Sequence, residues 1–348
     1  MWDVDAASAT RIKRRTGRTQ KAGQARVSTR RYLFSKIAQA FLTLAFVLAF
    51  NFFLFRGLGD PVTLLLHGHA SLTASAVADL KEQLGLGLPL PQQFIHYVNE
   101  TLHGNLGYAY DGTPVSTVIA TKAWPTLLLI GTSTIASIVI GIWIGIKQGW
   151  KRGSGFDQGM LGVTLVLYSM PEFWFGLLMI MLLAVTFQIF PTGGMTTPGA
   201  DYTGIKHVAD VLNHMTLPFF VLTVAYLAEY SIIMRSSLLE TLGEDFITTA
   251  RSKGMLEKRV LYKHAVPNAL LPTMTVTILS LGFVISGAIT IEIIFSWPGL
   301  GLETYNAILN KDYSTLEGLF LLFSASVIVA NLVADLLYSY LDPRVRAA

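Results

Sequence analysis

Six long apolar segments alternate with polar stretches along the chain. They lie at about Leu33–Phe55, Pro125–Ile146, Met160–Phe187, Thr216–Met234, Leu271–Ile294 and Leu316–Tyr338. Each is near or above the roughly 20 residues that a helix needs to cross about 30 Å of hydrocarbon. In lipid the backbone must satisfy its own hydrogen bonds, so these segments are expected to be helices. The pattern predicts an all-α polytopic membrane protein with six spans, of which the fourth is the shortest and contains Glu229.

The composition strengthens this prediction. The chain has 348 residues, of which 52% are hydrophobic and 14% are charged, with a mean hydropathy of +0.51. Ordinary soluble domains carry about 25% charged residues. So much apolar surface cannot be hidden in a water-soluble fold of this size, and a bilayer is the expected solvent. Cysteine is absent, which excludes disulfides, thiolate zinc sites and cysteine catalysis.

The distribution of Lys and Arg predicts the orientation of the spans. If the N-terminus is cytoplasmic, the inside segments carry ten, three, six and two of the 26 basic residues, and the outside segments carry five. Cytoplasmic loops of membrane proteins hold an excess of Lys and Arg. We therefore expect both termini in the cytoplasm, in a protein integral to the bacterial cytoplasmic membrane.

The polar stretches divide the rest of the chain. Residues 1–31 form a basic tail that is too polar to pack; it is expected to be disordered, to fix the orientation and to touch anionic lipid. Nucleic-acid binding is a weaker alternative for the tail, and we expect no nucleic-acid partner. Residues 32–346 form the membrane domain. Its outside region, about 57–122, has helical spacing at Ser75–Leu84 and Pro91–Leu102 with Gly and Pro between them, which predicts a small external cap.

The most informative polar stretch runs from about 235 to 270, between two spans. It carries the basic residues Arg251, Lys253, Lys258, Arg259 and Lys263. Residues 244–253 have acids near the start and bases near the end, as a short helix with a complementary dipole would have, and Gly254 is placed to end it. A patterned, basic segment of this kind presents a surface to a cytoplasmic partner. The simpler alternative is a solvated loop with helical propensity.

Motifs for catalysis are missing. The sequence contains no G-x-x-x-x-G-K-[ST] phosphate loop, no G-x-S-x-G and no H-E-x-x-H. The chain is therefore not expected to be an enzyme or to hydrolyse ATP itself. His67 and His69 could hold a metal, but two loop histidines are weak support, and we expect no metal or other cofactor.

Three carboxylates, Glu172, Glu229 and Glu292, fall within predicted spans. A charge at the bilayer centre costs about 3 kcal/mol even on insertion scales, so each is expected to face a polar interior or a membrane interface. Glu172 follows Pro171 and favours a polar cavity, whereas for Glu229 a place near the interface is an equal alternative. Gly141, Gly145 and Gly149 repeat every four residues, a spacing that lets helix backbones approach closely.

Four stretches together resemble a known family. Thr248-Thr249-Ala250, Gly254 and His264-Ala265-Val266-Pro267 align with a cytoplasmic motif of the form E-A-A, three residues, G, nine residues, I-x-L-P. The first two positions depart to Thr, and His264 replaces an apolar residue. The other matches are Gly104–Tyr108, Trp297–Gly301 and Asp335–Arg346. The chain resembles the integral-membrane permease subunit of the oligopeptide/dipeptide/nickel branch of binding-protein-dependent ABC importers.

This resemblance implies a fold, a set of partners and two sites. The fold is the six-span type I importer permease fold. The partners are a second homologous permease, two cytoplasmic ATPase subunits that carry ATP and Mg, an external solute-binding protein and membrane lipid. The implied ATPase-coupling residues are Glu244, Asp245, Ala250, Arg251, Lys253, Gly254 and Pro267. The residues expected to face a translocation pathway between two permeases are Tyr168, Ser169, Glu172, Ser280, Ser286 and Thr290.

The cargo implied by the resemblance is a peptide, with nickel complexes or glutathione as alternatives. An ATP-independent secondary transporter would instead show paired intramembrane charges and inverted repeats, and no convincing repeat is found. A membrane sensor or scaffold would need a signalling domain, which the sequence does not contain. Co-purification with an ATPase separates the importer from both.

Overall fold

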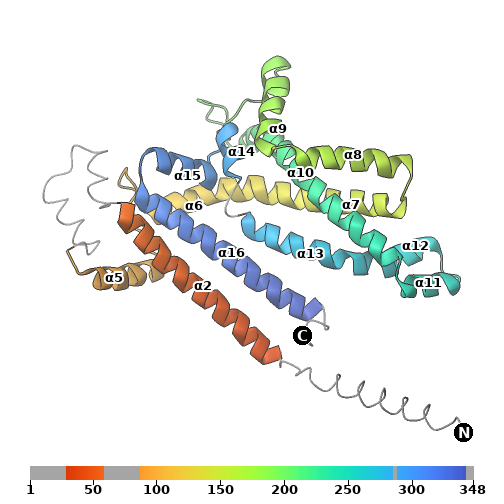
Figure 1. Ribbon diagram of the computed structural model, residues 1–348. Coiled ribbons are helices and arrows are strands. Elements are labelled where there is room, and N and C mark those ends of the chain that lie inside the picture. The colour runs from red at the N-terminus through yellow and green to blue at the C-terminus, as the bar shows by residue number, and fades with distance from the viewer. Residues whose placement is uncertain (1–28, 59–86, 285–287, 342–348) are drawn as a thin grey trace, which may run out of the picture.

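A computed structural model describes residues 29–58, 87–284 and 288–341 (Figure 1). Regular structure in these ranges is helical, apart from an isolated antiparallel bridge between Tyr108 and Pro114. The α-helices are α2 (Thr29–Leu58), α5 (Leu90–Leu102), α6 (Val115–Thr126), α7 (Thr132–Trp150), α8 (Gly155–Ser169), α9 (Glu172–Met179), α10 (Ile205–Leu242), α11 (Asp245–Ser252), α12 (Glu257–Val260), α13 (Val266–Phe283), α14 (Ile289–Ile294), α15 (Leu300–Leu309) and α16 (Tyr313–Leu341). There are also three π-helical segments: η1 (Leu127–Gly131) joins α6 to α7, η2 (Ile180–Thr186) continues α9, and η3 (Leu261–Ala265) joins α12 to α13.

Five stretches of the described chain are long and apolar enough to cross a membrane. They are Leu33–Gly57, Val115–Trp150, Ile205–Leu242, Glu257–Gly282 and Tyr313–Leu336. A sixth is obtained when the bent pair Gly155–Ser169 and Glu172–Thr186 is counted as one span. The predicted all-α architecture is confirmed.

Two of the predicted spans were wrong in detail. The segment Met160–Phe187 is not one helix, because the chain bends by 100° where Met170 and Pro171 separate α8 from α9. Pro171 cannot donate a backbone hydrogen bond, which explains the break at this position. The fifth span begins earlier than expected, at Glu257, and α13 ends at Phe283, so that Glu292 lies in the separate helix α14.

Helices α7 and α10 pack extensively against each other, and the glycine repeat explains how. A Cβ atom added at Gly141 would lie 2.6 Å from the Leu227 carbonyl oxygen, and one added at Gly145 would lie 2.6 Å from the Ser231 carbonyl oxygen. At Gly149 the added atom would lie 3.0 Å from Leu238. Only glycine permits the two backbones to approach this closely. The prediction that these glycines pack one helix against another is confirmed.

An ion pair fixes the turn between α7 and α8 to the same long helix. Asp157 in the first turn of α8 accepts hydrogen bonds from Arg235 Nε at 2.7 Å and Arg235 Nη2 at 3.0 Å, and from the Gly153 backbone N–H at 2.9 Å. The Asp157 side chain is buried and that of Arg235 is mostly so. Such bidentate pairs fix geometry as well as charge. The α7–α8 turn and α10 are thereby held together.

The apolar core has two main parts along the length of α10. One surrounds Leu217, Val221 and Leu222 and includes Phe295 and Trp297. The other surrounds Met234 and Leu238 and includes residues of α11, α12 and η3. Many other large apolar side chains on the spans are exposed, as expected where lipid covers the protein. Helix α10 therefore runs through the core from one end to the other.

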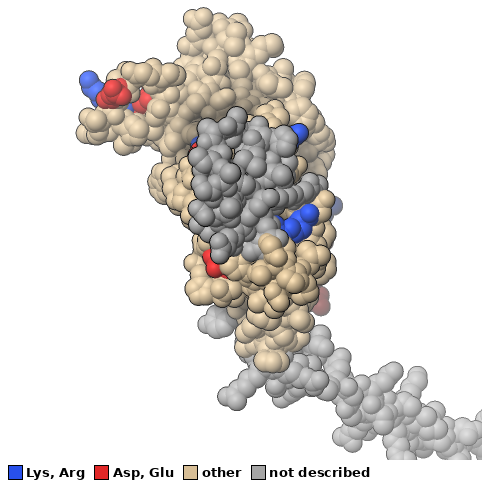
Figure 2. Space-filling model, turned by 90° about the vertical axis from the view of Figure 1, so that its left-hand side faces the viewer, with Lys and Arg blue, Asp and Glu red and all other residues tan. Residues whose placement is uncertain are grey.

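The short helices lie at opposite ends of the molecule. In Figure 1, α11 and α12 lie at one end of the long helices, and α5 and α15 lie at the other. Figure 2 looks onto the end that carries α5 and α15, and the described part of this face shows few charged side chains. The two ends therefore differ in the surfaces that they present.

Helix α5 confirms one of the two helices predicted for the cap; the other, Ser75–Leu84, lies outside the described residues. It packs on α2, where the Phe52 and Phe94 ring centroids are 5.3 Å apart. Asn51 Nδ2 contacts the Tyr97 hydroxyl at 3.4 Å and the Glu317 carbonyl oxygen at 3.0 Å. Burial and the nearby Glu317 carboxylate raise the pKa of Tyr97 above its usual value. Aromatic and polar contacts thus anchor this part of the cap to α2 and α16.

Candidate functional site

The segment expected to contact an ATPase forms a short helix closed by a glycine turn. Helix α11 begins at Asp245, and Gly254 follows it with φ +72°. The Gly254 N–H donates to the Arg251 carbonyl at 2.9 Å, and the Met255 N–H donates to the Ala250 carbonyl at 3.4 Å. This pair of bonds is a Schellman motif, which favours glycine at the left-handed position. The predicted helix and its end at Gly254 are confirmed.

One face of α11 packs on the protein itself. Ile247 is fully buried and Ala250 is 5% exposed, and both pack in the core around Met234 and Leu238. The sequence argument gave Ala250 a part in the close approach of a partner. Its burial shows that this small residue also supports the fold, because it lets α11 pack into the core around Met234 and Leu238. Gly254 has open space around its Cβ position, so its backbone conformation explains its presence.

The other face of this segment is exposed. Glu244, Asp245, Arg251 and Lys253 are all solvent-accessible. Arg251 pairs with Glu257 on α12 at 3.1 Å, and such an exposed pair contributes at most about 1 kcal/mol. The charged residues that were expected to take part in coupling are therefore exposed.

Three large apolar side chains accompany these charges, and the sequence analysis missed them. Phe246 is 42% exposed, Leu256 is 78% exposed and Tyr262 is 57% exposed. Apolar residues that interrupt a basic, polar segment were the available signal. Phe246 and Leu256 precede the span that begins at Glu257, and Tyr262 lies near its start. Apolar side chains beside charges at this end of the spans indicate a contact surface for another protein. We call the residues Phe246, Arg251, Lys253, Leu256 and Tyr262 the α11–α12 surface.

Pro267 occupies a position that its own chemistry explains. It lies at the start of α13, directly after the π-helical segment η3, and its side chain is exposed. Proline is favoured in the first turn of a helix, where its missing N–H would have no partner. Its place in the aligned motif therefore has a structural reason beside any role toward a partner.

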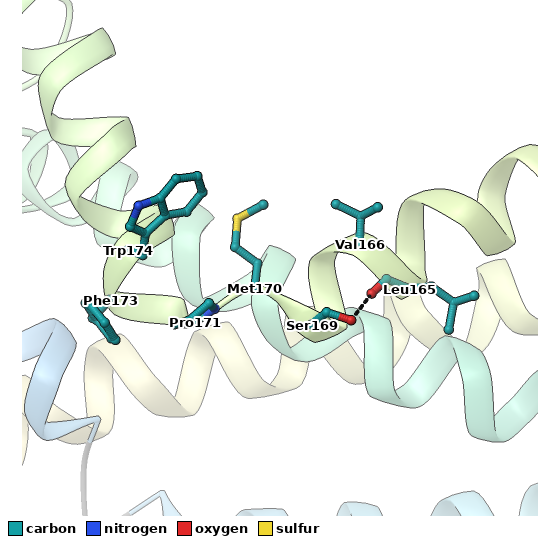
Figure 3. A pocket seen from close by; sticks show the side chains of 7 residues that line it. All are labelled: Leu165, Val166, Ser169, Met170, Pro171, Phe173 and Trp174. Carbon is teal, nitrogen blue, oxygen red and sulfur yellow. Dashed lines mark hydrogen bonds between the residues drawn. The ribbon is translucent and has the colours of Figure 1, made fainter.

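The bend between α8 and α9 borders a cavity of about 620 Å³ (Figure 3). The residues that line it are Leu165, Val166, Ser169, Met170, Pro171, Phe173 and Trp174. In Figure 3 the Trp174, Met170 and Val166 side chains extend to the same side of the bend. The Ser169 hydroxyl donates to the Leu165 carbonyl at 2.8 Å. The cavity is open and mostly apolar.

The structure brings together two of the residues expected along a pathway. The Thr290 hydroxyl donates to Glu172 Oε1 at 3.1 Å, which joins the start of α9 to the start of α14. Tyr226, from α10, also lies near this carboxylate. Glu172 is half-buried and Thr290 is exposed. Three elements that are distant in sequence therefore meet at one carboxylate.

The other expected pathway residues are placed differently. Ser169 lines the cavity, and Tyr168 is 61% exposed beside it in sequence. The Ser280 hydroxyl donates to the Val276 carbonyl at 2.8 Å and so is used within its own helix. Ser286 lies outside the described residues. The expected residues thus form no single group in the described part of the chain.

A buried carboxylate at the Trp297–Gly301 turn is a site that sequence reasoning gave no role. Glu292 is fully buried, and its Oε1 accepts the Thr126 hydroxyl at 2.8 Å. Its Oε2 accepts the Gly301 N–H at 2.7 Å and the Leu302 N–H at 3.1 Å, at the start of α15. A carboxylate at a helix N-terminus satisfies free N–H groups and complements the dipole. We call this arrangement the Glu292 site.

The residues of the turn fit closely around this carboxylate. The Trp297 indole N–H donates to the Pro125 carbonyl at 2.8 Å, and the Trp297 side chain is fully buried. Cβ atoms added at Gly299 or Gly301 would clash with the Glu292 carboxylate. The Trp-Pro-Gly-Leu-Gly sequence therefore serves to lock α6, α14 and α15 together. The predicted intramembrane placement of Glu292 and the family match at Trp297–Gly301 were the sequence signals for this site.

The stretch that includes Gly104–Tyr108 is similarly structural. Asp312, at the start of α16, accepts the Tyr110 N–H at 3.0 Å and the Thr315 hydroxyl at 2.7 Å. The Val115 N–H donates to the Gly107 carbonyl at 3.0 Å. These bonds attach the loop before α6 to the start of α16.

Among the residues described, no group of three or more His, Cys, Asp or Glu could hold a metal ion, and His67 and His69 lie outside them.

These features define an all-helical integral membrane protein of the permease class, with a locked turn at one end and an exposed two-helix surface at the other. The chain belongs to the family described as binding-protein-dependent transport system inner membrane component, whose model matches residues 137–347. The model of the N-terminal part of such transport components matches residues 29–116. The chain is therefore a permease component of the inner membrane rather than a catalytic subunit.

Similar proteins of known classification carry related names. The chain is 37% identical to a putative peptide permease protein of Brucella suis biovar 1 (strain 1330) over 290 residues. It is 38% identical to the dipeptide transport system permease protein DppB of Escherichia coli (strain K12) over 306 residues. Each match covers 83% of this chain and 90% of the relative. The oligopeptide transport system permease protein AppB of Bacillus subtilis (strain 168) is 36% identical, with 82% of this chain and 90% of the relative covered.

Proposed function

We propose that this protein is one of two permease subunits of an ATP-driven importer of peptides. The observation that carries the proposal is the combination of family membership with relatives named as peptide, dipeptide and oligopeptide permeases over nine-tenths of their length. A second, homologous permease completes the pathway. An external solute-binding protein delivers the peptide. Both termini of the chain lie in the cytoplasm, in agreement with the distribution of Lys and Arg.

Energy comes from two cytoplasmic ATPase subunits, which bind ATP and Mg. The α11–α12 surface supports this assignment, because it combines exposed apolar and basic side chains on a short helix that is fixed firmly to α10. The coupling residues Glu244, Asp245, Arg251, Lys253 and Gly254 lie on or next to this surface. Closure of the ATPases around ATP moves α11, and the rigid helices transmit the movement to the spans.

The pathway lies between the two permeases near the bend of α8 and α9. The bend supports this place, because it combines an open apolar cavity with the half-buried Glu172. Irregular backbone at membrane depth is tolerated where it lines a cavity or is buried in protein. Tyr168 and Ser169 lie at the same bend. Ser280 and Thr290 extend the proposed lining toward α13 and α14, and Ser286, outside the described residues, is proposed as a further member.

Reconstitution tests this function. The permease is assembled in liposomes with a second permease, two ATPases and a binding protein, which are sought among the neighbouring reading frames. We expect uptake of labelled dialanine that requires both ATP and the binding protein. Nickel complexes and glutathione are tested in the same vesicles, and preference for either would replace the peptide assignment. Uptake that persists without ATPases would contradict the importer and favour a secondary transporter.

A further inference from the structure

The turn between α7 and α8 carries positive charge that the described part of the chain does not neutralise. Lys147, Lys151 and Arg152 are all exposed. The cations of the ion pairs found among the described residues are Lys36, Lys122, His214, Arg235 and Arg251. The carboxylate nearest in sequence, Asp157, is buried and is bound through both oxygens by Arg235. The turn therefore presents basic side chains to a partner outside the described chain.

Two aromatic rings fix the position of one of these charges. The Lys147 Nζ lies 4.0 Å from the centroid of the Trp143 ring on α7 and 5.7 Å from that of the Phe156 ring in the first turn of α8. Trp143 is 55% exposed and Phe156 is 38% exposed. Contacts between a cation and aromatic rings at these distances are favourable. An ammonium group and two exposed rings, from two helices, are thus joined into one group by direct contacts.

The helical register extends this group in both directions along α7. Val139, Trp143, Lys147 and Lys151 follow one another at intervals of four residues, so they share one face. The Lys151 N–H donates to the Lys147 carbonyl at 3.1 Å, which continues the helical register to the second lysine. Val139 is exposed, and so is Val163, two turns after the aromatic ring of α8. The surface is therefore basic at the turn and apolar along both helices that lead away from it.

This surface lies where a span leaves the hydrocarbon. The span Val115–Trp150 has 36 residues, whereas a helix needs roughly 20 to cross the apolar core, so that its ends extend beyond it. In Figure 1 the turn between α7 and α8 lies at the same end of the molecule as α11 and α12. The distribution of Lys and Arg predicts that this end is cytoplasmic. Lysines and aromatic rings at such helix ends lie at the level of the lipid headgroups.

We propose that the α7–α8 turn binds an anionic phospholipid of the cytoplasmic leaflet. Lys147 and Lys151 contact its phosphate group, and the Trp143 and Phe156 rings lie beside the start of its acyl chains. Basic groups between spans on the cytoplasmic side suit such headgroups. An acidic protein surface would match the charge, but a lipid also matches the exposed apolar side chains that continue along both helices. The site is distinct from the basic tail and does not depend on the cargo.

The test measures which lipids gather at this turn. The chain has no native cysteine, and a Cβ atom added at Gly155 meets open space, so Gly155→Cys carries a fluorophore beside the site. The permease is assembled with cysteine-free partner subunits in vesicles that contain spin-labelled phosphatidylglycerol or spin-labelled phosphatidylcholine with the same acyl chains. The spin label quenches the fluorophore when the lipid is bound nearby. Because each basic residue near an anionic surface contributes a factor of about five, we expect phosphatidylglycerol to be preferred by about fivefold or more.

Charge variants separate the site from a general attraction to the protein. Lys147→Gln combined with Lys151→Gln should bring the preference close to one, and the pair Lys147→Arg and Lys151→Arg should retain it. The matched control is Lys258→Gln combined with Arg259→Gln, which removes the same charge from exposed positions on α12 and should leave the preference unchanged. If the glutamine pair does not assemble, Lys151→Gln alone should lower the preference.

Several results would overturn the proposal. These are equal quenching by the two lipids, an undiminished preference in the glutamine variants, or an equal loss in the α12 control. Loss of the preference when millimolar inorganic phosphate is added would indicate a site for a free anion instead. A glutamine pair that weakens ATPase association without changing the lipid preference would assign the turn to a protein contact. A fluorophore that neither lipid quenches would show that protein covers the turn.

Discussion

The Glu292 site includes residues that the sequence analysis matched to the family, and the α11–α12 surface lies beside others, yet the two regions are built in opposite ways. At the Glu292 site each carboxylate oxygen accepts a donor of the chain, and Trp297 fills the space beside the turn. At the α11–α12 surface Leu256 and Tyr262 are exposed. A family motif can therefore serve either to hold the fold or to present a surface.

Burial and hydrogen bonding separate these two uses. A side chain whose polar atoms are all paired inside the protein has no capacity left for a partner, and its loss is expected to reduce stability. A side chain left exposed outside the spans contributes little to stability, and its loss is expected to affect association. The comparison predicts that variants at the Glu292 site lose stability, whereas variants at the α11–α12 surface lose association with a partner.

The largest effect is expected at Gly254. Gly254→Arg places a β-carbon at a backbone φ of +72° and adds a long side chain beside the α11–α12 surface. Because the left-handed region costs an L-residue about 1–2 kcal/mol and the added bulk obstructs docking, we expect uptake to fall more than tenfold while insertion continues. Uptake and ATPase co-purification measure the change. Gly254→Asn, which tolerates this φ, is the matched control, and normal uptake in Gly254→Arg would contradict the docking role.

The second largest effect is expected when the buried Glu292 carboxylate is removed, and it is an effect on stability. Glu292→Ala leaves the Thr126 hydroxyl and the Gly301 and Leu302 N–H groups without their acceptor. Because each unsatisfied buried donor costs about 1–3 kcal/mol, we expect a loss of about 3 kcal/mol in the free energy of unfolding. Thermal unfolding in detergent measures it. Uptake per folded molecule should remain near normal in any molecules that fold, and a selective loss of ATPase binding would contradict the structural assignment.

A smaller effect is expected at the apolar part of the exposed surface. Leu256→Ser removes a side chain that is 78% exposed, so the stability of the permease should not change. If an ATPase covers Leu256, the lost apolar burial weakens association by about 1 kcal/mol, or roughly fivefold. Titration of the purified ATPase measures the affinity. Ile95→Ser, at a similarly exposed residue on α5 at the other end, is the control, and equal affinities for both variants would remove Leu256 from the interface.

The smallest effect is expected for the exposed ion pair of the same surface. Glu257→Ala breaks the contact with Arg251. Exposed pairs contribute about 0.2–1 kcal/mol. We therefore expect Glu257→Ala to lower the melting temperature by less than Glu292→Ala does, with both variants measured by thermal unfolding in detergent. A stability loss as large as that of Glu292→Ala would erase the distinction between the two regions.

Much of the fold could be predicted from the sequence because the bilayer imposes strict rules on length and polarity. The apolar segments, the glycine repeat on α7 and the helix ending at Gly254 all follow from local chemistry. A proline fixes where a helix is interrupted, but tertiary packing decides the direction in which the chain continues. The 100° angle of the bend at Met170–Pro171 therefore could not be predicted from the sequence.

The candidate sites were less predictable because they depend on contacts between distant segments. The Thr126–Glu292 hydrogen bond joins residues 166 positions apart, and the contact between Glu172 and Thr290 joins residues 118 positions apart. Both carboxylates and Thr290 were recognised individually, but their pairing was not, and Thr126 was not selected at all. Exposure of Phe246 and Leu256 likewise depends on which face of α11 and α12 the rest of the protein covers.

Helix α10 has a mechanical consequence that follows from its length. Its 38 residues form one continuous helix, which at 1.5 Å per residue is about 57 Å long. Its C-terminal end leads directly into α11, and Tyr226 near its middle lies near Glu172. Because the glycine contacts with α7 stiffen it, α10 would act as a lever on which each degree of tilt displaces one end relative to the other by about 1 Å. A few degrees of movement imposed at α11 would thus reach the far end of α10 as a displacement the size of a peptide side chain.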